Sequence, residues 1–199
     1  MVNLTIDGIA VSVPKGSTLL QAAAKANVSI PTLCFLKQVN EIGACRICVV
    51  EVEGHDNLVP ACTAKAEEGM VVLTNTARVK ENRRINLQFI LSQHDSNCPT
   101  CVRNSNCTLQ SLAAQYNLSA NPYTKAVPQK AWADTAYLLR DESKCIKCMR
   151  CVSVCDKIQQ MHVWDVVGTG SRTTVGVSEG RTFAQSGCTL CGQCQYVCL

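Results

Sequence analysis

The stretch Cys145-Ile-Lys-Cys148-Met-Arg-Cys151-Val-Ser-Val-Cys155 spaces its four cysteines as C-x2-C-x2-C-x3-C. The same spacing returns at the end of the sequence, in a second run made of Cys188, Cys191, Cys194 and Cys198. A lone C-x2-C pair is a weak signal, because structural zinc sites use it as well. Two complete runs in one short segment are far more specific. They predict that this part of the chain folds around bound metal.

The spacing resembles that of bacterial-type ferredoxins, in which each run surrounds a cubane [4Fe-4S] cluster. In two-cluster ferredoxins, three cysteines of a run bind one cluster and the fourth binds the other. We therefore predict a two-cluster domain with crossed ligands. One cluster is assigned to Cys145, Cys148, Cys151 and Cys198, and the second to Cys188, Cys191, Cys194 and Cys155. Structural zinc is the competing interpretation of the same cysteines.

Fifteen cysteines among 199 residues are far above ordinary usage, and they admit a disulfide framework, zinc or iron-sulfur clusters. The N-terminus, Met-Val-Asn-Leu-Thr-Ile-Asp-Gly, lacks the basic region and apolar run of a signal peptide. No stretch approaches the roughly 20 apolar residues that a membrane span requires. An odd number of cysteines without a secretion signal argues against disulfides and predicts a location in the reducing cytoplasm.

The formal net charge of +4 is a possible sign of an acidic partner such as nucleic acid. Oxidised clusters with their thiolate ligands carry about −1 to −2 each, so four of them would reverse the sign of the total. The basic side chains are therefore interpreted as compensation for cluster charge, and no nucleic-acid partner is predicted.

The N-terminal part of the chain has the pattern of a β-grasp domain. Two alternating apolar runs over residues 2–13 flank Asp7-Gly8, which is the strongest short-range signal of a β-hairpin. A helix is expected over residues 19–26, and further strands over residues 47–53 and 70–74. These elements predict a small mixed sheet with one helix packed across it.

Four cysteines in this part fit the ligand set of a plant-type [2Fe-2S] cluster. They are Cys34, Cys45, Cys48 and Cys62. The gap between Cys34 and Cys45 is longer than the one in plant ferredoxins, so the loop 35–44 must follow a different path. Gly43-Ala44 is what such a site needs, because small residues let backbone amides approach the sulfurs. Buried structural cysteines are the alternative interpretation.

Between these regions, helical patterns over residues 77–92 and 109–116 flank the motif His94-x3-Cys98-x2-Cys101-x5-Cys107. A lone histidine is more often a surface or core residue than a metal ligand. Here the three cysteines are one ligand short of a cluster, and the other sets use all remaining cysteines. We therefore predict that His94, Cys98, Cys101 and Cys107 bind one iron-sulfur cluster.

The chain is thus predicted to be an α+β protein of three parts. These are a [2Fe-2S] β-grasp domain over residues 1–76, a small helical cluster domain with one His and three Cys ligands plus a linker over residues 77–136, and a two-cluster bacterial ferredoxin-like domain over residues 137–199. The last part is interpreted as a pseudo-twofold repeat whose first returning strand spans residues 162–167. No equivalent strand follows Cys198, so we expect the sequence to be the front part of a longer protein.

This ordered series resembles the N-terminal accessory-cluster region of large [FeFe] hydrogenases, including the NAD(P)-linked, electron-bifurcating type. The resemblance covers essentially the whole chain, and its most specific parts are the His94 motif and the doubled cysteine run. Related arrangements occur in the G component of respiratory NADH dehydrogenases and in the α subunit of NAD-dependent formate dehydrogenases. In the G component only one cubane cluster remains in the corresponding unit, so two intact runs favour hydrogenase or formate dehydrogenase.

The resemblance implies a [4Fe-4S] cluster at His94, and hence one [2Fe-2S] and three [4Fe-4S] clusters in all. It implies electron transfer between partner subunits and a hydrogen-activating H-cluster beyond residue 199, with no catalytic residue in the chain itself. The implied partners are NADH-dehydrogenase-like flavin and iron-sulfur subunits and a ferredoxin, in a cytoplasmic hetero-oligomer.

Two departures and two rival functions remain. Asp156 and Leu199 stand where a proline usually follows the fourth cysteine, and Asp156 is expected to lower the potential of a neighbouring cluster. A Thr-Ser-Cys-Cys-Pro motif, which belongs to the H-cluster, does not occur in these residues. The same series of cluster sites would also suit a formate dehydrogenase or an NADH dehydrogenase-like subunit. A stand-alone polyferredoxin carrier is the non-enzymatic alternative.

Overall fold

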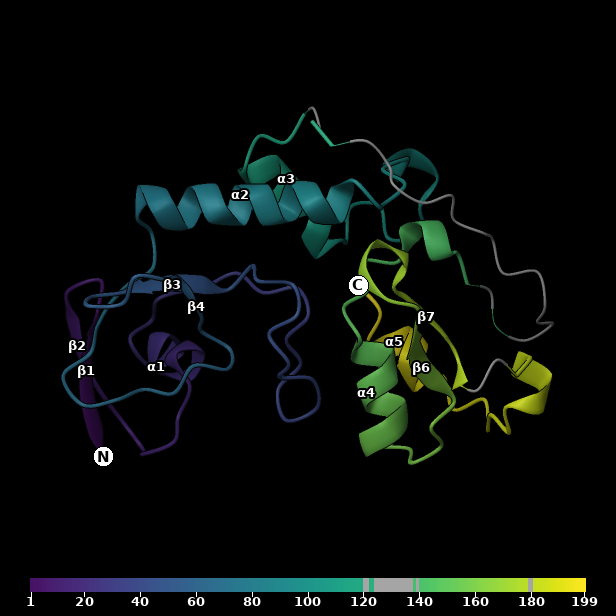
Figure 1. Cartoon of the computed structure of the whole chain (residues 1–199), viewed down its shortest axis with the longest axis horizontal. Coiled ribbons are helices and arrows are strands. Elements are labelled where there is room, and N and C mark those ends of the chain that lie inside the picture. The colour runs from purple at the N-terminus through teal and green to yellow at the C-terminus, as the bar shows by residue number, and fades with distance from the viewer. Residues whose placement is uncertain (120–121, 124–137, 139, 179–180) are drawn as a thin grey trace. The chain divides into compact units, whose positions relative to one another are not determined.

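The computed structural model describes residues 1–119, 122–123, 138, 140–178 and 181–199. The backbone separates into two compact units, of which the first comprises residues 1–35 and 41–87. The second comprises residues 36–40 and 88–199, and Figure 1 shows the elements of both. The short segment 36–40 therefore belongs to the second unit, although the sequence on either side of it belongs to the first.

The first unit is built on a five-stranded sheet with the strand order β2-β1-β5-β3-β4. Its strands are β1 (Val2–Ile6), β2 (Ile9–Val13), β3 (Val49–Val52), β4 (Val59–Pro60) and β5 (Val71–Leu73). The β1–β5 pair is parallel and the three other pairs are antiparallel. This is the mixed sheet expected of a β-grasp, and β4 is the one strand that the sequence pattern did not indicate.

Local sequence explains both the hairpin and the helix of this unit. Asp7 and Gly8 have φ values of 49° and 81°, which is the geometry of a two-residue turn that matches the twist of the strands. Helix α1 (Leu19–Lys25) begins behind Thr18, whose hydroxyl accepts from the backbone N–H of Gln21. The Gln21 side chain accepts in return from the Thr18 backbone N–H, which completes a capping box.

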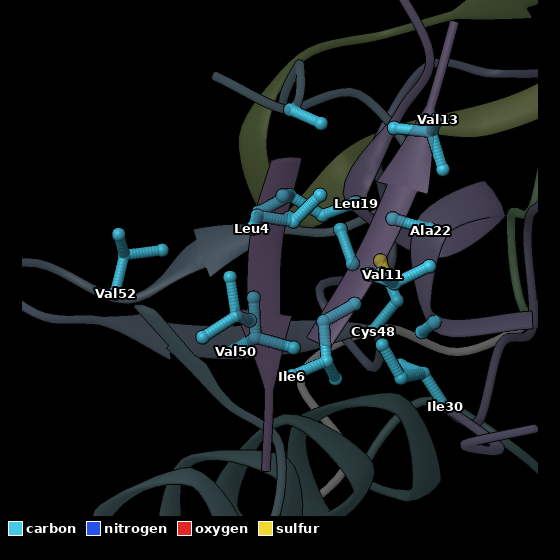
Figure 2. Packing of buried hydrophobic residues seen from close by; sticks show 14 of the residues in the cluster. Leu4, Ile6, Val11, Val13, Leu19, Ala22, Ile30, Cys48, Val50 and Val52 are labelled. Carbon is cyan, nitrogen blue, oxygen red and sulfur yellow. The ribbon is translucent and has the colours of Figure 1, made fainter. Parts of the chain in front are cut away.

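The core of the first unit lies between α1 and the sheet, as Figure 2 shows. Leu4 and Ile6 from β1 and Leu19 from α1 are all almost completely buried. Cys48 and Cys62 are part of the same cluster, each only 1% exposed. Two predicted cluster ligands therefore lie in a packed apolar core, which fixes the positions of their sulfurs.

The first half of helix α2 (Ala77–Leu91) is rich in charged residues, a pattern that usually indicates a solvated face. Arg78 and Arg84 are indeed about half exposed. Arg83, however, is only 4% exposed, and its Nη2 donates to the carbonyl oxygen of Val49 at 2.7 Å. The residue directly after Cys48 is thereby held by a buried guanidinium.

The second unit contains three further helices, one two-stranded antiparallel sheet and several short 3-10 turns among its described residues. They are η1 (Cys98–Thr100), α3 (Thr108–Gln115), η2 (Glu142–Lys144), α4 (Arg150–Lys157), β6 (Trp164–Val167), η3 (Gly170–Arg172), β7 (Thr174–Val177), η5 (Phe183–Gln185) and α5 (Gln193–Tyr196). Helix α4 packs against both α5 and β6. The small apolar core includes Trp164, Phe183 and Cys155.

The expected returning strand begins later than predicted. His162 has a φ of 50°, which interrupts extended geometry, so β6 starts only at Trp164. The His162 Nδ1 lies 2.7 Å from a carboxylate oxygen of Asp156. The predicted linker up to residue 136 lies largely outside the described residues. Among the residues that the structure describes, no helix is long and apolar enough to cross a bilayer.

Candidate iron-sulfur centres

All fifteen cysteines lie among the described residues, and every one of them is a free thiol. The disulfide interpretation of the cysteine content is therefore wrong. A folded chain that keeps this many thiols at cluster spacing offers soft sulfur ligands, which suit iron-sulfur clusters and zinc alike.

At the predicted [2Fe-2S] site, backbone amides surround the sulfurs of Cys34 and Cys45. The Cys34 N–H donates to the Cys45 sulfur at 3.4 Å, and the Cys45 N–H donates to the Cys34 sulfur at 3.5 Å. The Ala44 backbone also donates to the Cys34 sulfur. The contact from Ala44 agrees with the reason given for the small pair Gly43-Ala44, and hydrogen bonds to sulfur are one means by which proteins set cluster potentials.

The same four thiols form two directly contacting pairs, Cys34 with Cys45 and Cys48 with Cys62. A hydrogen bond from the Cys34 thiol lowers the pKa of Cys45 to about 6, and one from the Cys62 thiol lowers the pKa of Cys48 to about 7. The partner in each pair has a raised pKa, because it keeps the shared proton and is buried. Iron replaces such shared protons when it binds thiolates.

The loop between Cys34 and Cys45 takes the unusual path that its length required. Residues 36–40 form a tight turn in which the Asn40 N–H donates to the Leu36 carbonyl at 2.7 Å. The Asn40 side chain is completely buried, and its Nδ2 donates to the Cys148 carbonyl at 2.9 Å. Its Oδ1 accepts from the Ser153 hydroxyl at 2.6 Å. The turn thus fastens onto the first ferredoxin-type run and its helix α4.

The structure places the His94 motif on the stretch that leads from α2 to α3. His94 and Cys98 flank a short loop, Cys98 begins η1, and the Cys101 N–H donates to the Cys98 carbonyl at 3.0 Å. Cys107 is the cap residue of α3. All four predicted ligands are therefore on one local stretch, and their binding of a common cluster remains a prediction.

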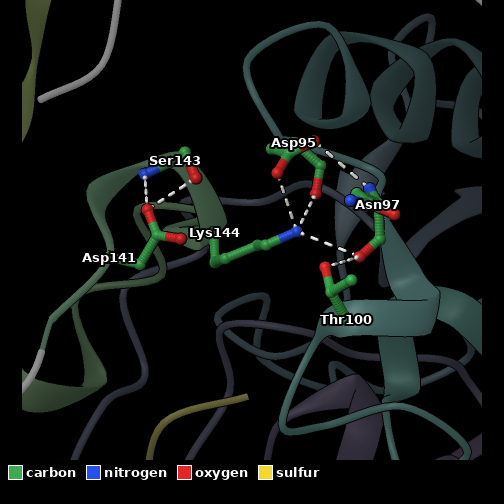
Figure 3. A network of polar contacts seen from close by, with 6 residues as sticks. All are labelled: Asp95, Asn97, Thr100, Asp141, Ser143 and Lys144. Carbon is green, nitrogen blue, oxygen red and sulfur yellow. Dashed lines mark hydrogen bonds and ion pairs between the residues drawn. The ribbon is translucent and has the colours of Figure 1, made fainter. Parts of the chain in front are cut away.

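Lys144 fastens this stretch to the first ferredoxin-type run (Figure 3). Its Nζ donates to the carbonyl oxygens of Asp95 at 2.8 Å and Asn97 at 3.3 Å. It also lies 2.9 Å from the Asp95 carboxylate, and the Asp95 N–H donates to the Ser143 carbonyl at 2.8 Å. The loop between His94 and Cys98 is therefore held by the residue immediately before Cys145.

Two more cations make similar contacts. The Lys147 Nζ donates to the side-chain oxygen of Gln93, the residue before His94. The Arg103 Nη2 donates to the carbonyl oxygen of Cys198 at 2.6 Å. Three cationic side chains therefore lie where the His94 stretch meets the predicted ligands of the first cubane site, and positive charge there would favour two anionic clusters close together.

We expect Lys144→Met to loosen the loop from Asp95 to Cys101. The substitution keeps the length of the side chain but removes three contacts to that loop. A partly exposed network of this kind is worth about 1–2 kcal/mol, or roughly tenfold in amide exchange rate. Hydrogen exchange should rise in the loop, whereas Lys80→Met on the exposed face of α2 should leave it unchanged. Equal exchange in both variants would show that Lys144 does not hold the loop.

We expect His94→Cys to lower the reduction potential of the cluster at that site. Thiolate replaces neutral imidazole and adds a negative charge, the reverse of the change that raises the potential of Rieske centres. An EPR-monitored redox titration measures the shift, and His55→Cys in a turn of the first unit is the control. An unchanged potential in His94→Cys would remove His94 from the ligand set.

The two ferredoxin-type runs share the same backbone conformation. Lys147 and Leu190, each directly before the second cysteine of its run, have φ values of 56° and 57°. Met149 and Gly192, each directly after it, have φ values of 63° and 73°. In both runs the N–H two residues beyond the first cysteine donates to that cysteine's sulfur at 3.4 Å. The repeat seen in the cysteine spacing is therefore also a repeat in geometry.

Cysteines of both predicted crossed ligand sets lie near one another. The charge of Cys198 acts on Cys148 and Cys151 of the first run, and the charges of Cys145 and of Cys194 from the second run act on Cys198. The second set lines a single cavity of about 240 Å³. Its cysteines are Cys155, Cys188, Cys191 and Cys194. Cys155 reaches this cavity from α4, whereas the other three come from the second run.

The surroundings of the thiols in the first run disfavour free ionised sulfur. Burial raises the pKa of Cys148 to about 11 and that of Cys151 to about 12. Within the described residues, no three His, Cys, Asp or Glu side chains are grouped to hold a single metal ion. In a cluster each thiolate binds a different iron, so its sulfurs need not converge on one point. A cubane cluster at the cavity lined by Cys155, Cys188, Cys191 and Cys194 therefore stays a prediction.

Sequence reasoning missed the polar side chains that hold the ligand loops. Asn40, Lys144 and Arg103 carry no metal-binding chemistry of their own, so no motif indicated them. The only hint in the sequence was that two of these residues stand close to predicted ligands. Lys144 precedes Cys145, and Arg103 lies between Cys101 and Cys107. Asp156 was expected to lower the potential of a neighbouring cluster, and that stays a prediction; the structure places its carboxylate 2.7 Å from the His162 Nδ1.

Comparison with protein families divides the chain in the same order. A 2Fe-2S iron-sulfur cluster binding domain matches residues 1–77. The NADH-ubiquinone oxidoreductase-G iron-sulfur binding region matches residues 83–122, and a 4Fe-4S dicluster domain matches residues 144–199. The chain is therefore a mixed α/β protein with 2Fe-2S and 4Fe-4S ferredoxin-like domains.

Similar proteins are components of oxidoreductases. The NADP-reducing hydrogenase subunit HndD of Solidesulfovibrio fructosivorans is 40% identical over all of this chain and 35% of its own length. The alpha subunit of the NADPH-Fe(3+) oxidoreductase of Geobacter sulfurreducens is 34% identical over all of this chain and 23% of its own length. The NADH-ubiquinone oxidoreductase 75 kDa subunit of Reclinomonas americana is 32% identical over 92% of this chain and 27% of its own length. The chain thus spans about a third or less of these relatives.

A solved structure shows the same architecture. The crystal structure of an NAD+-reducing [NiFe]-hydrogenase in the H2-reduced state aligns with a TM-score of 0.82 at 27% identity. The alignment covers 90% of this chain and 76% of that chain. The domain matches, the relatives and the structure agree on the type of protein. The chain is therefore similar, over most or all of its length, to part of subunits of an NADP-reducing hydrogenase, an NAD+-reducing hydrogenase and NADH-ubiquinone oxidoreductase.

Proposed function

We propose that the chain is the electron relay of an [FeFe] hydrogenase subunit. It passes electrons between NAD(P)H- or ferredoxin-linked partner subunits and an H-cluster that lies outside this sequence. The relay holds one [2Fe-2S] cluster at Cys34, Cys45, Cys48 and Cys62, and one [4Fe-4S] cluster at His94, Cys98, Cys101 and Cys107. Two further [4Fe-4S] clusters occupy the crossed ligand sets of the ferredoxin-like domain.

The observation that carries this proposal is the pair of ferredoxin-type runs with matching loop geometry. A subunit that needs only one cubane cluster there has no use for two such loops, and both are intact in this chain. The identity of 40% to a subunit of an NADP-reducing hydrogenase supports the same assignment. The many free thiols support a reducing location such as the cytoplasm.

The chain's own residues hold, orient and shield the electron carriers. Bound clusters supply one-electron redox chemistry. Backbone amides at Lys147 and Leu190 donate to ligand sulfurs, which stabilises negative charge there. The cations Lys144, Lys147 and Arg103 fasten the His94 stretch beside the first cubane site, so the spacing of the two sites does not depend on loop motion.

A second candidate is the corresponding part of an NADH dehydrogenase-like subunit. It is favoured by the match to the NADH-ubiquinone oxidoreductase-G region and by the identity of 32% to an NADH-ubiquinone oxidoreductase 75 kDa subunit. Both candidates use the same relay, and they differ in the reaction at its far end.

The decisive experiment uses the full-length natural protein, purified without oxygen. Hydrogen gas alone should reduce its clusters, as followed by EPR, and metal analysis of this chain should give about fourteen iron atoms. Reduction by NADH through partner subunits but not by hydrogen would favour the second candidate. Zinc in place of iron, without visible absorption, would overturn the relay itself.

A further inference from the structure

A buried cation of helix α2 lies beside the backbone of the predicted [2Fe-2S] site. Arg83 is only 4% exposed, and its Nη2 donates to the Val49 carbonyl oxygen at 2.7 Å. Val49 directly follows Cys48, so bond lengths limit the separation of that nitrogen from the Cys48 Cα to about 9 Å. Cys48 is itself only 1% exposed. Little water is therefore available to screen the charge of Arg83 from a group bound at Cys48.

A second side chain of α2 holds the same loop on the other side of Cys48. The Asn86 Nδ2 donates to the Arg46 carbonyl oxygen at 2.9 Å. Arg46 lies between Cys45 and Cys48 in the sequence. Positions 83 and 86 are three residues apart, so they share one face of the helix. The two contacts bracket Cys48, and only the one from Arg83 brings a charge to it.

The charge of Arg83 has no carboxylate partner in the part of the chain that the structure describes. Glu81 on the same helix lies 2.6 Å from the Arg84 Nη2. Glu51 on β3 lies 3.6 Å from the Arg78 Nη1. The Arg83 Nε is buried and has no hydrogen-bond acceptor among the described residues. A buried charge without an anion close by is costly, so this position calls for an anionic partner.

We propose that Arg83 is the buried counter-charge of the [2Fe-2S] cluster and that it raises the reduction potential of that cluster. An oxidised cluster with its thiolate ligands carries about −1 to −2, which supplies the anion that Arg83 lacks within the protein. Reduction adds one electron and one unit of negative charge, so a fixed cation nearby stabilises the reduced form. This inference rests on the proposed [2Fe-2S] site, and it names the side chain that favours the arrival of an electron there.

The test is an EPR-monitored redox titration of the full-length protein, purified without oxygen, with dithionite as the one-electron reductant. The [2Fe-2S] signal is the one that disappears in Cys62→Ala. Arg83→Gln removes the charge but keeps an N–H donor. At a fixed potential it should lower the ratio of reduced to oxidised cluster about tenfold, which is about 59 mV for a one-electron couple. Arg83→Lys keeps the charge and should recover most of that ratio. An unchanged ratio in Arg83→Gln, or no recovery in Arg83→Lys, would overturn the proposal.

Two control variants separate this charge from its surroundings. Arg84→Gln removes the same charge at the next position of α2, where the side chain is 41% exposed and screened by solvent, so the potential should not change. Asn86→Ala removes the other contact to the loop without removing a charge, and it should also leave the potential unchanged. An equal shift in Arg84→Gln would assign the effect to surface charge, and an equal shift in Asn86→Ala would assign it to loop geometry. Either result would overturn the role of Arg83.

Iron analysis distinguishes this role from the proposed site and from simple packing. A natural protein without a [2Fe-2S] signal would overturn the site itself, and the counter-charge with it. A signal whose potential does not respond to Arg83→Gln would overturn only the counter-charge. If Arg83→Gln loses the cluster, its retention in Arg83→Lys would show that the charge is what holds it. Loss in both variants would make Arg83 a packing residue and overturn the proposal.

Discussion

Replacing Cys155 by Ala is expected to remove the cluster of the second cysteine run, although Cys155 belongs to the first. The structure gives the reason, because Cys155 lines the same cavity as Cys188, Cys191 and Cys194. The Cys155 sulfur also accepts from the Val163 N–H at 3.4 Å, which holds it on the buried side of α4. The loss of one cubane cluster should lower the iron content by about four atoms per chain.

Double variants show which cysteines share a cluster. If Cys155 and Cys188 bind the same cluster, each single Ala variant and the double variant should all lose about four iron atoms. Combining Cys155→Ala with Cys145→Ala should instead remove two clusters and about eight iron atoms. Uncrossed ligands would reverse the pattern: Cys155 and Cys145 would then be equivalent, and Cys155 with Cys188 would be additive. Reduced-state EPR of the same samples identifies which signals remain.

Much of the first unit was predictable because its signals are local. Asp7-Gly8 enforces a turn by backbone conformation alone, and the alternating residues around it place one side of each strand in the core. The capping box at Thr18 similarly marks the start of α1 in the sequence itself. The cysteine runs are local in the same sense, since their left-handed residues wrap the loop around the sulfurs within a few positions.

What could not be predicted depends on contacts between distant segments. The buried guanidinium of Arg83 looked like part of a solvated face, because its partner is a backbone carbonyl on β3 and no sequence pattern marks that atom. The predicted start of β6 was two residues too early for a related reason. His162 has a left-handed backbone conformation, which delays the strand, and its side chain pairs with Asp156. Contacts between two single residues leave no periodic pattern in the sequence, so pattern analysis does not reveal them.

The turn 36–40 is the clearest case, and it leads to a prediction about stability. Asn40→Ala is expected to cost about 2–4 kcal/mol locally, because it leaves the Cys148 carbonyl and the Ser153 hydroxyl without their partner and opens a small cavity. Asn40 is 0% exposed, so water cannot easily replace the lost hydrogen bonds. Hydrogen exchange of the amides in α4 is the measurement, because α4 carries Ser153 and begins directly after Met149.

A double-mutant cycle separates the hydrogen bond from general damage to packing. Ser153→Ala alone removes one contact to Asn40 and should cost about 1–2 kcal/mol. Asn40→Ala in that background should then cost less than it does alone, because the Ser153 hydroxyl is no longer there to be left unpaired. Asn86→Ala is the matched control, since Asn86 also donates to a backbone carbonyl, that of Arg46, from a partly exposed position. Fully additive effects at positions 40 and 153 would mean that the bond between Asn40 and Ser153 contributes nothing, and that the bond from Asn40 to the Cys148 carbonyl carries the whole effect.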